Sequence, residues 1–220
     1  MEAIFLVCGA GGPHLKRNPF GGILNIMLTA EEKSGLGIAM TEATLLGAEV
    51  NVEERLAAVT LAVFTLPEAG PVPQDRRLQF LFQGVGRVAV SLRLARWDDP
   101  TARVEPFTIE HLLPVVQGFG GCAIYGWDFI DRDDDIARWT DRLSLDLSAP
   151  AVPVSHSVLL FQEGRNRHLD LAIWFRTLRF FTPAMDEVAL TDVIAGGKRW
   201  WDAFYADDSR THGFGIMRLR

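Results

Sequence analysis

The feature that most constrains the fold is a turn-forming segment, Glu163–Asn166, that separates two apolar-rich runs. The run before it reads Ser-Val-Leu-Leu-Phe-Gln, and the run after it alternates apolar and polar side chains. Such alternation is typical of a strand with one buried face. That face is predicted to carry Leu169, Leu171, Ile173 and Phe175. This pattern of two runs around a turn-forming segment predicts a β-hairpin within residues 155–181.

Other runs of the chain predict further strands and short helices. Strands are expected at Ala3–Val7, Ile23–Leu28, Leu36–Leu46, a central Arg55–Leu66, Cys122–Ile130 and a closing Gly213–Arg220, with a second hairpin over residues 78–94 around Gln83–Gly86. Helices are expected at Ile109–Val116, at Asp133–Leu143 and after Thr182-Pro183, the last with a kink or break at Gly196–Gly197. The fold class is α+β, with a mainly antiparallel sheet, hairpins, a few short helices and a C-terminal amphipathic helix. A doubly wound fold is disfavoured, because regular alternation of strands with long helices is missing.

The segment Pro67–Asp75 is the best linker candidate, because its three prolines and one glycine disfavour both helix and paired strand. It divides the chain into a strand-rich region over residues 1–70 and an α+β region over residues 76–220. One continuous domain is the alternative.

Charge and cysteine content narrow the classes of partner. The formal net charge of −6 repels phosphate backbones and argues against nucleic-acid binding. Two cysteines, Cys8 and Cys122, are too few for a disulfide framework. The first residues lack the positive charge and the long apolar run of a signal peptide, and no run is apolar enough to span a membrane. We therefore expect a cytoplasmic protein.

No nucleotide-binding or metal-binding motif is complete. Gly9–Gly12 follows a predicted strand, but Pro13 and His14 break the dinucleotide pattern. Asp131, Asp133 and Asp135 have calcium-loop spacing without its glycine or its bidentate acid. Capping of a helix N-terminus explains these aspartates equally well. The five histidines contain no zinc-binding pair, so no metal and no cofactor is expected.

A row of polar residues on the second strand of the Glu163–Asn166 hairpin is the first candidate site. His168, Asp170, Trp174 and Arg176 alternate along this strand, on the face opposite to His156. An aspartate can orient a histidine as a general base, and an arginine can hold a carboxylate or phosphate. His168, Asp170 and Arg176 are thus the catalytic candidates, and Trp174 on the same face is a candidate for contact with a ligand or partner. An ordinary solvated sheet face is the alternative explanation.

Two further segments are candidates for contact with a ligand or partner. The loop between Gly11 and Gly22 carries His14, Lys16 and Arg17 in an otherwise acidic chain, although a solvated connection explains it as well. Trp200 is expected to be partly exposed on its helix, because adjacent tryptophans cannot face the same way. Packing of Trp200 under a neighbouring loop is the alternative.

A Tyr-Gly-Trp-x-Phe strand within Ala123–Asp131, followed by Trp139, residues 143–145, the Glu163–Asn166 hairpin and Trp200-Trp201, resembles a pattern in uncharacterised bacterial proteins, some of them immunity partners of toxins. The resemblance covers about the last two thirds of the chain. It implies a bacterial origin and a binding role, and it brings no catalytic residue with it.

These observations favour a non-catalytic binding protein that acts through protein contacts, with a protein partner or a second copy of the chain as its ligand. The resemblance adds the expectation of an immunity-like role. The alternative is a small-molecule enzyme with a polar pocket near His168, Asp170 and Arg176.

Overall fold

The computed structural model of the chain describes residues 28–96, 99, 101–130, 140–149, 156–164 and 166–216. The expected strand Ala3–Val7 lies outside the described residues, as do the loop residues His14, Lys16 and Arg17 and all but the last residue of Ile23–Leu28. Most of the expected helix Asp133–Leu143 also lies outside them. Within it, Thr140–Arg142 forms a 3-10 helix, η2.

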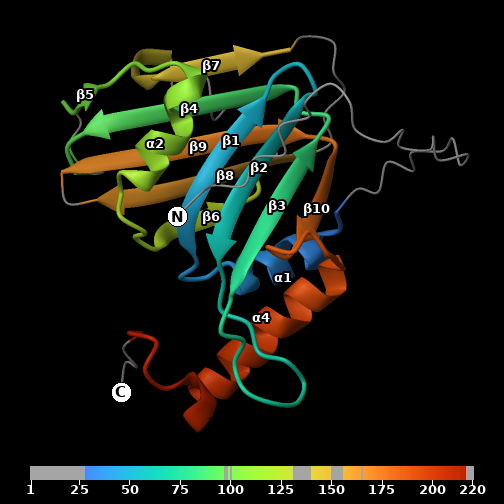
Figure 1. The fold of residues 1–220 in the computed structure, drawn as a ribbon. Coiled ribbons are helices and arrows are strands. Elements are labelled where there is room, and N and C mark those ends of the chain that lie inside the picture. The colour runs from blue at the N-terminus through green and yellow to red at the C-terminus, as the bar shows by residue number, and fades with distance from the viewer. Residues whose placement is uncertain are drawn as a thin grey trace, which may run out of the picture.

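The strands form two antiparallel sheets, which cross one another in Figure 1. The five-stranded sheet has the order β1 (Thr44–Asn51), β2 (Leu56–Ala62), β3 (Arg77–Gln83), β10 (Thr177–Phe181) and β11 (Glu187–Val188). The six-stranded sheet has the order β5 (Arg103–Val104), β4 (Arg87–Leu94), β9 (Arg167–Phe175), β8 (His156–Gly164) and β6 (Ile124–Asp128), with β7 (Leu145–Ser148) also paired to β4. The prediction of an α+β fold with mainly antiparallel pairing is confirmed.

The main hydrophobic core lies between the two sheets and takes side chains from both. The ring centroids of Phe82 in β3 and Phe175 in β9 are 4.9 Å apart across it. Strand β2 pairs with β1 on one side and β3 on the other, which confirms its predicted central position. Because apolar and polar side chains alternate along the strands, each sheet has an apolar face, and these two faces pack against each other.

One of the two predicted hairpins is confirmed and the other is wrong. β8 and β9 pair from His156↔Phe175 to Gly164↔Arg167, so two residues form the turn. β3 and β4 do not pair with each other, because they belong to different sheets. Between them Gly84 has a φ of +64°, and Gly86 already donates its N–H to the Trp174 carbonyl in the other sheet. The glycine loop is a crossing between sheets, and the apolar faces of β3 and β4 meet across the core.

The segment Pro67–Asp75 is a loop between two neighbouring strands. The pairing of β2 with β3 extends to Ala62 and Arg77, on either side of this loop. Residues before and after the predicted boundary therefore share one sheet and one hydrophobic core.

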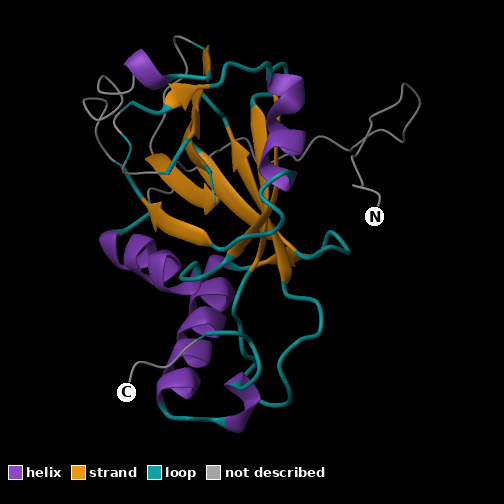
Figure 2. Ribbon diagram, turned by 90° about the vertical axis from the view of Figure 1, so that its left-hand side faces the viewer, coloured by secondary structure: helices purple, strands orange, loops and turns teal. Residues whose placement is uncertain are grey.

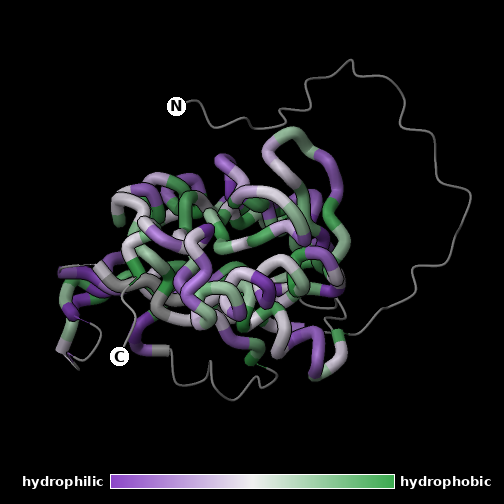
Figure 3. Tube along the Cα trace, turned by 90° about the horizontal axis from the view of Figure 1, so that it is seen from below, coloured by the Kyte–Doolittle hydropathy of each residue, from purple (hydrophilic) through white to green (hydrophobic). Residues whose placement is uncertain are grey.

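Three α-helices complete the described structure: α1 (Ala30–Ala39), α2 (Leu112–Gln117) and α4 (Leu190–Tyr205). α2 follows the 3-10 helix η1 (Ile109–His111) and ends at Gly118, as the sequence predicts for Ile109–Val116. Figure 2 shows α1 and α4 together at one end of the sheets. In Figure 3, hydrophobic and hydrophilic residues alternate at short intervals along the chain. No helix within the described ranges combines the length and the apolar character that a membrane span requires.

Helix α1 corrects the prediction of a strand over Leu36–Leu46. The Thr29 hydroxyl accepts the Glu32 N–H at 3.1 Å, and the Glu32 carboxylate accepts the Thr29 N–H at 2.7 Å. This capping box starts the helix, which ends before β1 begins at Thr44. The apolar run of residues 36–46 thus belongs to two elements.

The C-terminal segment also departs from prediction in three places. After Thr182 the chain forms a turn and β11, and α4 begins only at Leu190. No kink is needed at Gly196–Gly197, because α4 is continuous there and the two glycines are sites of close packing. Residues Gly213–Ile216 form turns rather than the expected closing strand, whose last four residues lie outside the described part.

Candidate functional site

The predicted polar row on β9 begins with a real histidine–aspartate pair. His168 Nε2 lies 2.8 Å from Asp170 Oδ1, and Arg93 of the neighbouring strand β4 approaches the other carboxylate oxygen at 3.4 Å. The register of β4 and β9, with Arg93 opposite His168, brings these groups to one face of the six-stranded sheet.

This face is neither solvated nor accessible to a substrate. His168 is 5% exposed and Asp170 is 7% exposed, and Ser91 beside them is fully buried. The pKa of Arg142 in η2 is lowered, mainly by burial and also by Arg93, while the nearby Asp170 opposes this change. A buried, charge-paired network of this kind fixes the positions of its side chains.

Arg176 does not join the other two catalytic candidates. It follows the last residue of β9, and its N–H donates to the carbonyl of Gln83 in β3. Its side chain lines a concavity that includes His156 and Gly84, not His168 or Asp170. The alternation ends with the strand, so the predicted three-residue site is not assembled.

The two tryptophans predicted to contact a ligand or partner are both buried. Trp174 is 4% exposed and lies under the Arg87 guanidinium, 5.1 Å from its ring centroid. Trp200 is fully buried, so the prediction of partial exposure is wrong. Phe64 and Phe204 pack on Trp200 at centroid distances of 4.5 and 5.3 Å. Apolar residues around α4 enclose both Trp200 and Trp201 in a second cluster.

Within the described ranges, no group of three or more His, Cys, Asp or Glu side chains is placed to hold a metal ion. The aspartates with calcium-loop spacing, Asp131, Asp133 and Asp135, lie outside those ranges.

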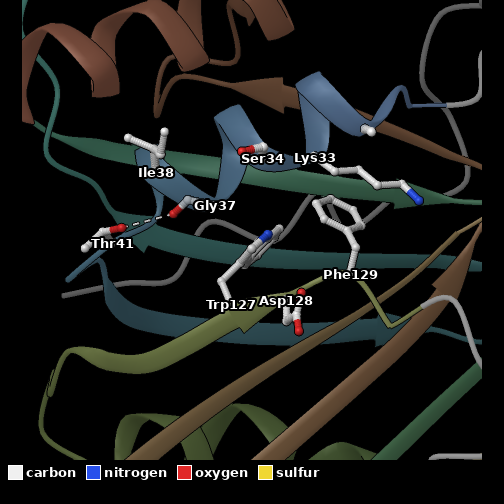
Figure 4. A pocket seen from close by; sticks show the side chains of 9 residues that line it. Lys33, Ser34, Gly37, Ile38, Thr41, Trp127, Asp128 and Phe129 are labelled. Atoms are coloured by element: carbon white, nitrogen blue, oxygen red, sulfur yellow. Dashed lines mark hydrogen bonds between the residues drawn. The ribbon is translucent and has the colours of Figure 1, made fainter.

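A groove of about 490 Å³ between α1 and β6 is the best candidate site (Figure 4). Its α1 wall and its β6 wall come from segments far apart in the sequence. The groove is lined by Ala30, Lys33, Ser34, Gly37, Ile38, Thr41, Trp127, Asp128 and Phe129.

One wall of the groove is formed by β6, the last strand in the order of the six-stranded sheet. β6 is the last strand of the six-stranded sheet and pairs with β8 along one edge. On its other edge, only the beginning is covered, where the Ile124 N–H donates to the Ala43 carbonyl at 2.7 Å. Among the residues that the structure describes, no strand pairs with this edge from Gly126 onward. The groove therefore lies beside a stretch of β6 whose outer edge no described strand pairs with.

The side chains of the groove combine an apolar base with hydrogen-bond donors. Trp127 packs on Phe80 of β3, with ring centroids 5.4 Å apart. Its indole N–H is shielded from solvent and has no acceptor within the described part of the chain. The Lys33 ammonium lies 5.6 Å from the Phe129 ring centroid. Ile38 is 44% exposed, which is high for an isoleucine beside the core.

An extended backbone laid along β6 can satisfy such an edge, because strands pair through main-chain N–H and C=O groups. The sequence predicted β6 and its aromatic residues but not α1, so the groove itself was missed. The capping box Thr29-x-x-Glu32 is the signal that identifies the second wall.

Comparisons of the chain with protein-family models, with curated proteins and with solved structures found no match.

Proposed function

We propose that the chain is a non-catalytic cytoplasmic binding protein that acts through protein contacts and takes an extended segment of its partner into the groove between α1 and β6. The observation that carries this proposal is the edge of β6 that no described strand pairs with from Gly126 onward, beside a groove with an apolar base. Unpaired edges are sites of strand addition unless a protein covers or blocks them.

Main-chain pairing supplies affinity in this mode, and the side-chain pockets supply specificity. The exposed Ile38 and the Phe129 ring favour an apolar side chain on the bound segment. The Trp127 indole N–H favours a hydrogen-bond acceptor, since a buried donor without a partner costs about 1–3 kcal/mol. Lys33 at one wall and Asp128 at the other allow charge to fix the direction of the segment.

The class of partner is a prediction that depends on the sequence resemblance. A toxin that is inhibited by contact is the partner class that the resemblance implies. The groove favours recognition of an extended stretch of that partner over recognition of a flat surface.

The test is a display library of random linear peptides selected on the full chain, with the affinity of enriched peptides measured by fluorescence polarisation. A Cβ at Gly37 meets no atom within 4 Å, so Gly37→Arg can extend a long side chain into the groove. We expect this variant to weaken binding at least about 10-fold, because a long side chain blocks the approach to β6. Trp127→Phe keeps an aromatic ring at this position but removes the indole N–H, and we expect the affinity for the peptide to fall about 5-fold.

Glu31→Arg is the matched control, because it places the same side chain on an exposed position of α1 that does not line the groove. It is expected to bind as the wild type does. Peptides that bind Gly37→Arg and wild type equally, or a selection that enriches no peptide, would contradict the proposal.

A further inference from the structure

A second concavity, of about 630 Å³, lies where β9 passes into β10. Part of its wall is apolar and is formed by Leu28, Leu178 and Leu190. Two arginines, Arg176 and Arg179, contribute the positive charge. Its volume is within the range of about 300–1,000 Å³ that is usual for sites of small organic ligands.

Arg176 is held in place, and no carboxylate of the described residues pairs with it. Its methylene groups pack on Gly84, where a Cβ would lie 2.8 Å from the Arg176 Cδ. Gly84 has a φ of +64°, a conformation that other residues rarely adopt, so this close approach depends on glycine. Among the residues that the structure describes, no carboxylate pairs with the half-buried Arg176 guanidinium. A guanidinium in this position can receive an anion in a bidentate manner.

The remaining charged groups of the concavity balance one another. Arg179 donates to Glu187 through Nε at 2.7 Å and through Nη2 at 2.5 Å. Hydrogen bonding to Arg179 lowers the pKa of Glu187, so this carboxylate stays ionised. His156 accepts the Leu28 N–H on Nε2 at 3.1 Å, so that nitrogen carries no proton and the ring is neutral. Among the described residues that line the concavity, one positive charge, that of Arg176, is in excess.

We propose that this concavity binds a small organic monocarboxylate with an apolar body. Arg176 pairs with the carboxylate, and the leucine side chains cover the apolar part of the ligand. A phosphate dianion fits less well, because a single excess charge does not neutralise it and Glu187 repels it. This ligand is of a different class from the peptide segment proposed for the groove, and the two sites share no lining residue.

The test is calorimetric titration of the full chain with octanoate, with octanol as the neutral probe of the same length and with inorganic phosphate. Octanoate is expected to bind in a saturable manner, at least about 10-fold more tightly than octanol or phosphate. Arg176→Gln is expected to weaken octanoate binding about 10- to 100-fold, because the charge-assisted hydrogen bonds are lost.

Arg77→Gln is the control, since Arg77 is exposed, pairs with Asp75 and does not line the concavity. It is expected to leave octanoate binding unchanged, as is the groove variant Gly37→Arg. The proposal is overturned by octanoate binding that is equal in a folded Arg176→Gln variant, by equal affinity for octanol, or by the absence of saturable octanoate binding to the wild type. Circular dichroism confirms the folded state of each variant.

Discussion

Helix α1 contacts α4 on one side and borders the groove beside β6 on the other, and glycines lie on both sides. Toward α4, a Cβ on Gly35 would lie 2.6 Å from Cγ2 of Ile194, and a Cβ on Gly197 of α4 would lie 2.5 Å from Cα of Ala39. Toward β6, a Cβ on Gly37 would meet nothing within 4 Å. The same residue type therefore serves close helix packing in one region and leaves space in the other. Stability should depend on the first region, and binding on the second.

The largest effect is expected for Gly197→Ala. The new Cβ collides with the backbone of Ala39, and a backbone atom cannot move aside as a side chain can. The gain in helix propensity, about 1 kcal/mol, does not offset a clash with backbone, so we expect a net loss of about 2–3 kcal/mol. In a chain of this size the melting temperature should fall by about 5–10 °C. An unchanged melting temperature would show that the helices are not in close contact at this point.

A smaller effect is expected for Gly35→Ala, because the atom that its Cβ meets belongs to a side chain. Ile194 is half-buried and can shift, so the free energy of unfolding should fall by no more than about 1 kcal/mol. In an Ile194→Ala background the same substitution should become stabilising by about 0.5–1 kcal/mol, since only the helix propensity gain remains. A double-mutant cycle by urea denaturation measures this coupling. Additivity of the two changes would exclude the contact.

The smallest effect is expected for Gly37→Ala, and its sign is the opposite of that for Gly197→Ala. The helical glycine faces open space, so alanine should stabilise the chain by about 0.5–1 kcal/mol. Thermal unfolding should show a rise of about 2 °C in melting temperature. A fall instead would mean that the groove at Gly37 is occupied by part of the folded chain.

Much of the fold could be predicted from local patterns, because period-2 alternation and turn residues act over a few neighbouring positions. The pairing of β8 with β9 and the central position of β2 followed from such patterns. The false hairpin over residues 78–94 shows where this reasoning fails. Alternation states which face of a strand is apolar, but it does not state which strand lies beside it. β3 and β4 are adjacent in sequence and belong to different sheets.

The candidate sites were less predictable than the fold. The sequence pattern predicted that His168, Asp170 and Arg176 share one face of a strand. In the structure His168 and Asp170 are buried, and Arg176 lies beyond the end of β9 and lines a different concavity. The predicted partial exposure of Trp200 was wrong for a related reason. Phe64, which is distant in the sequence, packs on the Trp200 ring. Exposure depends on what packs over a strand or helix, which its own periodicity does not reveal.

The sequence by itself determined the fold class and the hairpin at Glu163–Asn166. It also carries the capping box at Thr29, a local signal that the strand prediction over Leu36–Leu46 overlooked. Each depends on residues close together in the chain, where propensity and capping act directly. Only the tertiary structure decided that β6 comes last in the order of its sheet, that α1 lies beside it, and that no described carboxylate pairs with Arg176 next to His156. These features depend on contacts between segments that are distant in the sequence. Packing of the whole core sets those contacts, and no local pattern encodes them.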